Sequence, residues 1–175
     1  GRPWHEQGSA MGVIFRLLFL SALSACSFAD DSLLAPGQKL NDFSWPSAFN
    51  NLPGQRLAEQ IGHPVMLIWT DDCDRCEEQL VRYQNLALGY QGKGLVSWVV
   101  WTPDGQDLPP TMRIPVLKAD PDWRTGWQFE SRPAVMLINA AGELDKLIIG
   151  RLTDNYRETE KTLADWMAQN ARQKP

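Results

Sequence analysis

The 175-residue sequence has few of the residues on which metal sites and disulfide frameworks depend. It contains three cysteines and two histidines, so a four-ligand zinc site and a multi-disulfide scaffold are both poorly supplied. No apolar run reaches the roughly 18–20 residues of a membrane-spanning helix. The chain also has no excess of basic residues: it contains 17 Lys and Arg and 21 Asp and Glu, which gives a net charge of −4. This balance argues against nucleic acid as a partner, since phosphate binding needs a basic surface.

The residues that are present indicate a globular domain preceded by an export segment. Hydrophobic residues make up 43% of the chain and charged residues 22%, as in ordinary folded domains. Residues 1–10 have no periodicity, and we interpret them as an upstream extension or a cloning remnant. Residues 11–25 carry one basic residue, Arg16, before a short apolar stretch that ends in small residues, which is typical of a signal peptide. Residues 26–40 are a predicted tether, and residues 41–172 a predicted single domain.

Two cleavage sites are compatible with this N-terminal segment. Residues 23–26 (LSAC) resemble the bacterial lipobox, in which Cys26 becomes the lipidated first residue and anchors the protein to a membrane. Residues 27–29 (SFA) would instead suit an ordinary signal peptidase, and an uncleaved hydrophobic anchor is a third interpretation. All three predict a domain outside the cytoplasm.

The rest of the chain alternates patterns of strand and helix. Continuous apolar runs predict strands buried on both faces at 65–69, 95–101 and 134–138. Further strands are predicted at 41–45, at 114–117 and, returning antiparallel after a turn, at 144–149. Helical patterns are expected at 55–61, after residues 70–72, at 120–129 and at 154–169. This order predicts an α/β fold with a central mixed sheet flanked by helices.

One motif carries chemistry: the CxxC pair Cys73 and Cys76, at the junction of the apolar run 65–69 and the following helix. Free N–H groups and the positive end of the macrodipole at a helix N-terminus stabilise a thiolate. The second cysteine, one turn later, can close a disulfide. A c-type haem site would need His after Cys76, where Glu77 stands. A purely structural disulfide stays open, although so short a loop gains little from closure.

Two longer segments carry a resemblance to a known family. Residues 63–76 (HPVMLIWTDDCDRC) and 131–152 (SRPAVMLINAAGELDKLIIGRL) resemble the thioredoxin fold, most closely exported, membrane-tethered thioredoxin-like proteins of the TlpA/ResA type. The resemblance covers residues 36–170. It implies that Cys73 attacks, that Cys76 resolves, and that Pro133 is the cis-proline that presents backbone to the substrate. An ordinary trans proline at a strand start is the alternative for Pro133. Trp69 matches an aromatic of the family motif, or simply packs in the core.

The sequence also departs from this family's pattern. Asp72 replaces the Trp that usually precedes the first cysteine, and Leu67 stands where classical thioredoxins bury an acid. Gln79 replaces a Glu found in some exported members. Because of these departures, we expect the site to have no dedicated buried general base.

Charged residues surround the cysteine pair. Asp72 and Asp74 disfavour a thiolate at Cys73, whereas Arg75 favours it. The resemblance brings Arg132 near the disulfide, and we hypothesise that its charge offsets the aspartates and helps to keep Cys73 ionised. The alternative is a solvated loop arginine.

These observations predict an extracytoplasmic thiol–disulfide oxidoreductase that needs no cofactor and no metal. The resemblance implies protein clients with thiols or disulfides, a membrane electron donor and a reductase role, and we expect a monomer. One alternative is a thiol peroxidase: Thr70-x-x-Cys73 resembles part of the peroxiredoxin motif, although Met66 stands where its proline is expected. Another is a binding or assembly module that holds Cu(I) between two thiolates, with Trp123 and Trp127 as an apolar docking surface.

Overall fold

The computed structural model describes residues 34–70, 76–102, 108–119, 127, 129 and 131–172. The predicted signal peptide, Cys26 and most of the predicted tether lie outside these residues, and so do Cys73 and its neighbours from 71 to 75. Within the described part, no helix combines the length and apolar character needed to cross a membrane.

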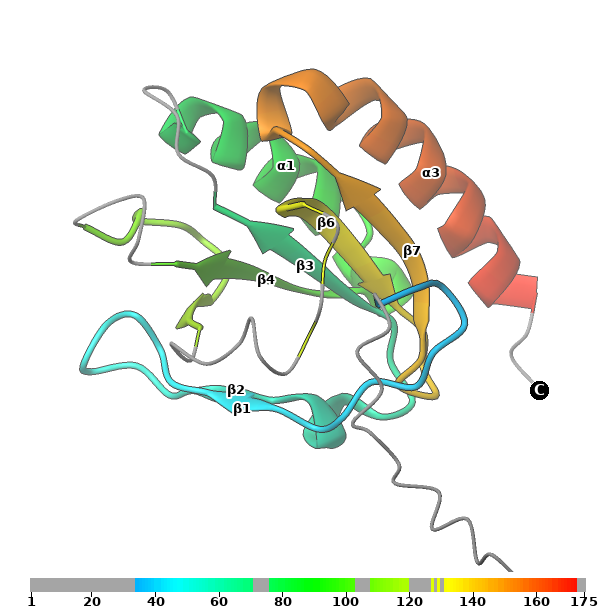
Figure 1. Cartoon of the computed structure of the whole chain (residues 1–175), viewed down its shortest axis with the longest axis horizontal. Helices are drawn as coiled ribbons and strands as arrows, with labels where there is room; N and C mark the ends of the chain where they lie inside the picture. Colours follow the sequence, from blue (N-terminus) through cyan, green and yellow to red (C-terminus); the bar gives the residue numbers. More distant parts are fainter. Residues whose placement is uncertain are drawn as a thin grey trace, which may run out of the picture. The chain divides into compact units, whose positions relative to one another are not determined.

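A five-stranded mixed sheet of order β5-β4-β3-β6-β7 forms the centre of the described fold (Figure 1). The central strand β3 (Val65–Trp69) pairs in parallel with β4 (Val96–Trp101), which pairs in parallel with β5 (Val116–Lys118). On its other side β3 pairs antiparallel with β6 (Pro133–Ile138), and β6 pairs antiparallel with β7 (Leu144–Ile149). All five residues of β3 are buried, as its unbroken apolar sequence predicts.

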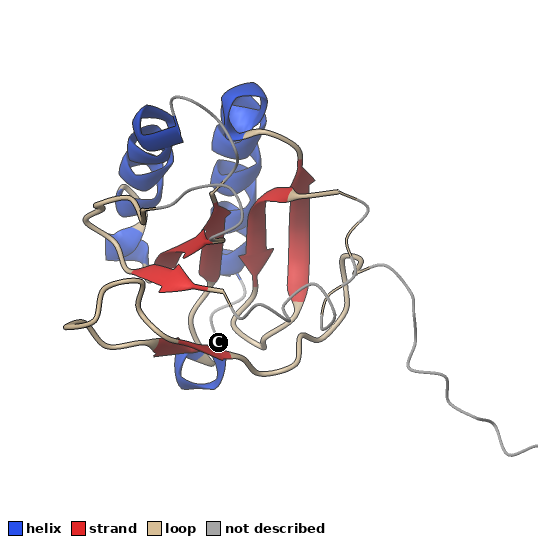
Figure 2. Ribbon diagram, turned by 60° about the vertical axis from the view of Figure 1, so that its left-hand side comes forward, coloured by secondary structure: helices blue, strands red, loops and turns tan. Residues whose placement is uncertain are grey.

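Two helices, α1 (Cys76–Leu88) and α3 (Leu152–Arg172), lie on one face of this sheet (Figure 2). The apolar stripe of α1 is buried against the sheet through Leu80, Tyr83 and Ala87. The hydroxyl of Tyr83 also donates a hydrogen bond of 2.6 Å to the carbonyl oxygen of Leu152. The first helix is thereby fixed to the start of the last one.

The opposite face of the sheet is covered by a small N-terminal layer. It consists of β1 (Ser44–Trp45), β2 (Gln55–Arg56) and the 3-10 helix η1 (Leu57–Gln60). The carboxylate of Asp42 accepts hydrogen bonds from Arg56 Nε at 2.7 Å and from the N–H of Ala58 at 2.8 Å. These bonds connect Asp42, two residues before β1, to β2 and η1.

Aromatic side chains fill the space beneath this N-terminal layer. The rings of Phe43 and Trp45 stack at 4.2 Å, and Trp45 meets Trp69 edge to face at 6.1 Å. Trp127 lies 5.5 Å from Trp45 and is 8% exposed. Edge-to-face arrangements of this kind are favourable beyond the area that they bury.

Most of the predicted elements are present. The strands expected at 65–69 and 144–149 have these bounds in the structure, and the remaining described strands differ from expectation by a few residues. The expected helical turn at 55–61 is in fact β2 followed by η1, because residues 55 and 56 pair with β1. The expected helix at 120–129 lies outside the described residues except for Trp127 and Phe129, neither of which is helical.

Candidate functional site

The CxxC motif lies between the end of the central strand and the first helix. Strand β3 ends at Trp69, and Cys76 is the first residue of α1. Cys73 is outside the described residues, but it follows the described Thr70 by three positions. Since a chain spans at most about 3.3–3.6 Å per residue, the two Cα atoms are within roughly 11 Å of each other. Thr70 beyond β3 and Cys76 at the start of α1 are therefore the described residues nearest to this cysteine along the chain.

Two buried threonines form this end of the sheet. Thr70 follows β3 and Thr102 follows β4, and each is 1% exposed. The N–H of Thr102 donates to Thr70 Oγ1 at 3.3 Å, and the N–H of Thr70 donates to the carbonyl oxygen of Val100 at 3.0 Å. The two parallel strands are thus joined just beyond their last residues.

Arg132 reaches the same place from the segment before β6. Its Nη1 donates to the carbonyl oxygen of Thr70 at 3.2 Å, and its Nη2 donates to Thr102 Oγ1 at 3.0 Å. Its own carbonyl oxygen accepts the N–H of Gly150 at 3.1 Å. The side chain is half-buried and its guanidinium donates two hydrogen bonds, so Arg132 is not a freely solvated loop arginine. An influence of this charge on Cys73 stays a prediction.

Pro133 is the first residue of β6, where it pairs with Ile149 and is buried. None of the described residues is joined by a cis peptide bond, so the bond between Arg132 and Pro133 is trans. The expectation of a cis bond at this position is therefore corrected. The structure shows the alternative, a trans proline at a strand start, where a missing N–H costs no interior ladder hydrogen bond.

Trp69 is a core residue in the structure. It is fully buried, and its ring lies 5.8 Å from that of Phe129 and 6.3 Å from that of Trp127. Because Trp127 is buried in the same cluster, the suggestion that it forms an exposed docking surface is wrong. Trp123, its suggested companion, lies outside the described residues.

The described residues at or near the departures from the thioredoxin-like pattern lie either in the core or in the first turn of α1. Leu67 is fully buried on the face that holds the aromatic cluster. Glu77 and Glu78 are exposed in the first turn of α1, and Gln79 is half-buried. Asp72, Asp74 and Arg75 lie outside the described residues. No group of three or more potential metal ligands occurs among the side chains that the structure describes.

One residue at this end of the sheet, Thr102, is not predicted from the sequence. Thr102 opens a stretch rich in proline and glycine, outside every strand and helix that the sequence predicts. The available signal was its position directly after the second parallel strand, since the carboxyl ends of parallel strands share one edge of a sheet.

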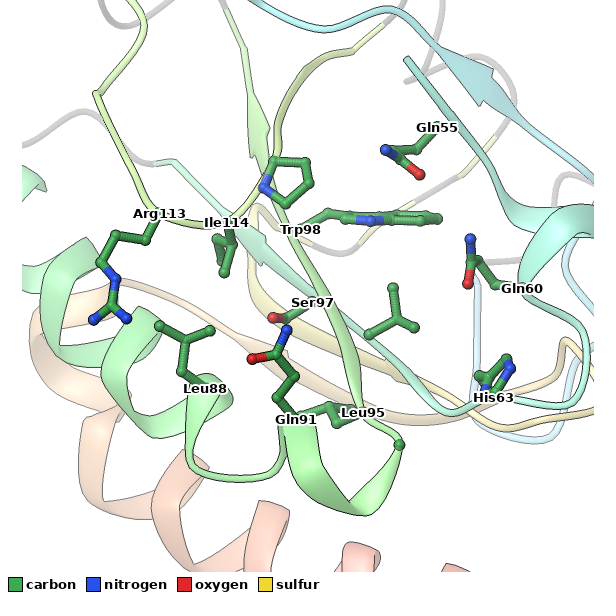
Figure 3. A pocket seen from close by; sticks show the side chains of 13 residues that line it. Gln55, Gln60, His63, Leu88, Gln91, Leu95, Ser97, Trp98, Arg113 and Ile114 are labelled. Atoms are coloured by element: carbon green, nitrogen blue, oxygen red, sulfur yellow. The ribbon is translucent and has the colours of Figure 1, made fainter. Parts of the chain in front are cut away.

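A groove of about 420 Å³ lies at the opposite, amino end of β4 (Figure 3). Ser97 and Trp98 of β4 line it together with Gln91, His63 and Arg113. Its lining includes no cysteine and no carboxylate. The groove therefore contains none of the predicted site residues.

Comparison with known proteins establishes the fold. Models of known protein families gave no match, and neither did the curated proteins. Among solved structures, a putative thiol:disulfide interchange protein DsbE from Chlorobium tepidum is similar, with a TM-score of 0.60 and 18% identity over 77% of this chain and 99% of that one. The pneumococcal exposed lipoprotein thioredoxin from Streptococcus pneumoniae has a TM-score of 0.53 and 20% identity over 70% and 99% of the two chains. The mitochondrial 2-Cys peroxiredoxin from Plasmodium falciparum has a TM-score of 0.58 and 11% identity over 81% and 99%. The chain has a thioredoxin fold, as predicted.

Proposed function

We propose that this protein is an extracytoplasmic thiol–disulfide oxidoreductase that reduces client disulfides with Cys73 and Cys76. The observation that carries this proposal is the place of the CxxC motif, between the central strand β3 and the start of α1 in a thioredoxin fold. A thiolate at this junction is favoured by the N–H groups and the macrodipole of the following helix.

The reaction proceeds by two exchanges. The thiolate of Cys73 attacks one sulfur of the client disulfide, so a mixed disulfide forms and the other client sulfur leaves as a thiolate. Cys76, deprotonated, then attacks the Cys73 sulfur and releases the second client sulfur. Two electrons pass to the client, and the Cys73–Cys76 pair becomes a disulfide. A membrane electron donor of the dithiol class returns it to the reduced state.

The location rests on the N-terminal segment. The apolar stretch at 11–25 and the lipobox-like residues at 23–26 support export and a lipid anchor at Cys26. The names of two similar structures, a thiol:disulfide interchange protein and an exposed lipoprotein thioredoxin, agree with a location outside the cytoplasm.

The first test is the reduction potential of the Cys73–Cys76 pair in the full chain, purified in detergent and equilibrated with glutathione or dithiothreitol buffers. A potential of roughly −230 to −270 mV supports a reductase, and one near about −120 mV makes the protein an oxidant instead. A pair that stays oxidised below about −300 mV is a structural disulfide, which contradicts the proposal.

Trapping of a mixed disulfide distinguishes exchange with a client protein from mere oxidation and reduction of the cysteine pair. Cys76→Ser should accumulate a mixed disulfide with a client protein, because the resolving thiol is gone. Cys26→Ser, which removes the third cysteine, is the matched control and should exchange at the rate of the unaltered chain. Failure of Cys76→Ser to form any mixed disulfide would contradict the assigned roles.

A second candidate is a thiol peroxidase, favoured by the likeness to a peroxiredoxin structure and by Thr70-x-x-Cys73. Met66 stands where the peroxiredoxin pattern has proline, so we place this candidate second. Consumption of hydrogen peroxide by the reduced protein, faster than its reduction of a protein disulfide, would reverse this order.

A further inference from the structure

The sheet has a vacant strand position beside the amino end of β4. The N–H of Val99 donates to the carbonyl oxygen of Pro115 at 2.9 Å, and the N–H of Ala119 donates to that of Trp101 at 3.1 Å. Every second residue of β4 therefore faces β5, and Ser97 is the preceding residue in this series. Within the described part of the chain, no backbone group pairs with the N–H of Ser97.

The chain leaves this position because of Gln84 and Pro115. The buried side chain of Gln84, in α1, accepts through Oε1 the N–H groups of Arg113 and Ile114. Pro115 has no N–H with which to continue the ladder toward the start of β4. The residues before β5 are thus held by α1 instead of β4, and the space beside Ser97 belongs to the groove of about 420 Å³.

Two main-chain groups at this edge match a single residue of an added strand. The carbonyl oxygen of Leu95, just before β4, accepts no backbone hydrogen bond from the described residues, and the N–H of Ser97 donates none to them. In a parallel ladder one residue donates its N–H to a carbonyl oxygen and accepts the N–H two positions further along the neighbouring strand. One residue in the vacant position can therefore bond to both Leu95 and Ser97.

The charge of the groove selects an anionic group. Its ionisable side chains are those of Arg113 and His63, both exposed, and none of the described residues that line it carries a carboxylate. Within the described part, the guanidinium of Arg113 takes part in no ion pair. A strand that enters this position parallel to β4 has to end at Pro115. Of the possible chain ends, a carboxylate therefore fits, because a guanidinium attracts it and repels an ammonium group.

The groove has a different wall on each face of β4 (Figure 3). Trp98 lies on the side of Gln55 and Gln60, whereas Ser97 lies on the side of Leu88. Successive side chains of an added strand point to opposite faces of the sheet. The last two residues of a bound peptide would thus contact different walls, one with amide groups and an indole ring and one with an aliphatic side chain.

We propose that this groove binds the C-terminal end of an extended peptide segment of a partner protein. The last residue of the peptide occupies the vacant strand position. Its N–H donates to the carbonyl oxygen of Leu95, and its carboxylate accepts hydrogen bonds from the N–H of Ser97 and the guanidinium of Arg113. Strand addition and capture of a terminal carboxylate are both recurrent modes of peptide recognition. The inference does not rest on the proposed redox function.

The test uses the full chain in detergent with Cys73→Ser and Cys76→Ser, so that no mixed disulfide contributes to binding. The probe is a library of N-acetylated hexapeptides of random sequence, without cysteine and with a free C-terminal carboxylate. We expect the library to contain peptides with a Kd below about 100 μM, measured by fluorescence polarisation. Amidation of the C-terminus of the tightest binder should raise Kd at least about tenfold, because a charge-assisted hydrogen bond is lost.

Matched variants test the role of Arg113. Arg113→Gln should raise the Kd of the carboxylate peptide about tenfold and should change that of the amidated peptide less than about twofold. Arg157→Gln removes an exposed arginine of α3 that does not line the groove, and should leave both values within about twofold.

A methyl scan of the peptide backbone tests strand addition. N-methylation of the last residue removes the N–H that donates to Leu95, and should raise Kd at least about tenfold. N-methylation of the residue before it, whose N–H faces away from β4, should raise Kd less than about threefold. Hydrogen exchange of the Ser97 N–H should slow at least about tenfold when the peptide binds.

Three results would overturn the inference: a library without binders, an amidated peptide that binds as tightly as the carboxylate, or equal effects of the two methylations. An amidated peptide that keeps its affinity would show that the groove binds internal acidic segments instead. Amidation and methylation change only the peptide, so they decide even if Arg113→Gln does not fold. A chain that binds these peptides but reduces no disulfide loses its proposed function and keeps this inference.

Discussion

The two ends of the central sheet share the same strands and differ in almost every other respect. At the carboxyl end of β3 and β4, Thr70, Thr102 and Arg132 are joined by hydrogen bonds of 3.0–3.3 Å. At the amino end a groove of about 420 Å³ opens beside Ser97, with amide and imidazole side chains around it (Figure 3). The hydrogen-bonded polar groups therefore lie at the end that leads to the CxxC motif, and the groove lies at the end away from it.

A single residue helps to explain why the amino end is open. Pro115 precedes β5, and its carbonyl oxygen accepts the N–H of Val99. As a proline it has no N–H to donate, so the ladder between β4 and β5 does not extend toward Ser97. Strand β5 therefore pairs with only the last three residues of β4, Val99, Val100 and Trp101.

The largest expected difference between the two ends is in the rate of disulfide reduction, and it is tested by changing one residue at each end. Cys73→Ser should lower the rate of disulfide reduction by at least about 100-fold, because the nucleophile is lost. His63→Gln, in the groove, should leave the rate within about twofold. Both rates are measured by reduction of insulin with dithiothreitol as the electron source. A large loss in His63→Gln would show that the groove belongs to the reactive site.

The next largest effect concerns stability at the amino end. The buried side chain of Gln84 accepts, through Oε1, the N–H groups of Arg113 and Ile114. Gln84→Leu leaves both donors without this acceptor and should cost about 2–4 kcal/mol of unfolding free energy, measured by urea denaturation. Activity per folded molecule should not change.

The control for this substitution is Gln91→Leu, which removes an exposed glutamine that lines the groove. It should change the unfolding free energy by less than about 0.5 kcal/mol. An equal loss of stability in both variants would mean that Gln84 contributes no specific hydrogen bonding.

A smaller effect is expected at the carboxyl end. Arg132→Met should slow disulfide reduction several-fold below the Cys73 pKa, where loss of the cation reduces the thiolate fraction. Above that pKa the rates of variant and unaltered chain should converge, because both thiols are then ionised. The measurement is a pH–rate profile, and a rate deficit that is constant with pH would contradict an electrostatic role.

The smallest effect lies away from both ends, in the N-terminal layer. The hydrogen bond from Arg56, followed by that from the N–H of Ala58, lowers the pKa of Asp42. A lowered folded pKa stabilises the fold above the unfolded pKa, and this contribution is lost as the pH falls through the folded value. Asp42→Asn should therefore lower Tm slightly at pH 7, and the difference should vanish in acid. A Tm difference that persists at pH 2 would exclude this linkage.

The sequence predicts local structure well and long-range partners poorly. The bounds of β3 and β7 follow from unbroken or alternating apolar residues, which need no knowledge of neighbours. The strand at Gln55–Arg56 is not predicted from the sequence, because its pairing with β1 depends on residues outside the local window. Likewise, Arg132 was singled out by its place before Pro133, whereas its partner Thr102 is identified only by the fold.

The antiparallel pairing of β3 with β6 has a consequence for the order of folding. Val65 pairs with Ile138, so the central strand lacks one neighbour until the ribosome has made most of the chain. Contacts of such sequence separation form late, since loop closure must precede them. During synthesis both cysteines of the motif therefore emerge well before the sheet that supports them is complete. The motif is therefore exposed to wrong pairing in any chain in which β6 has not yet joined β3.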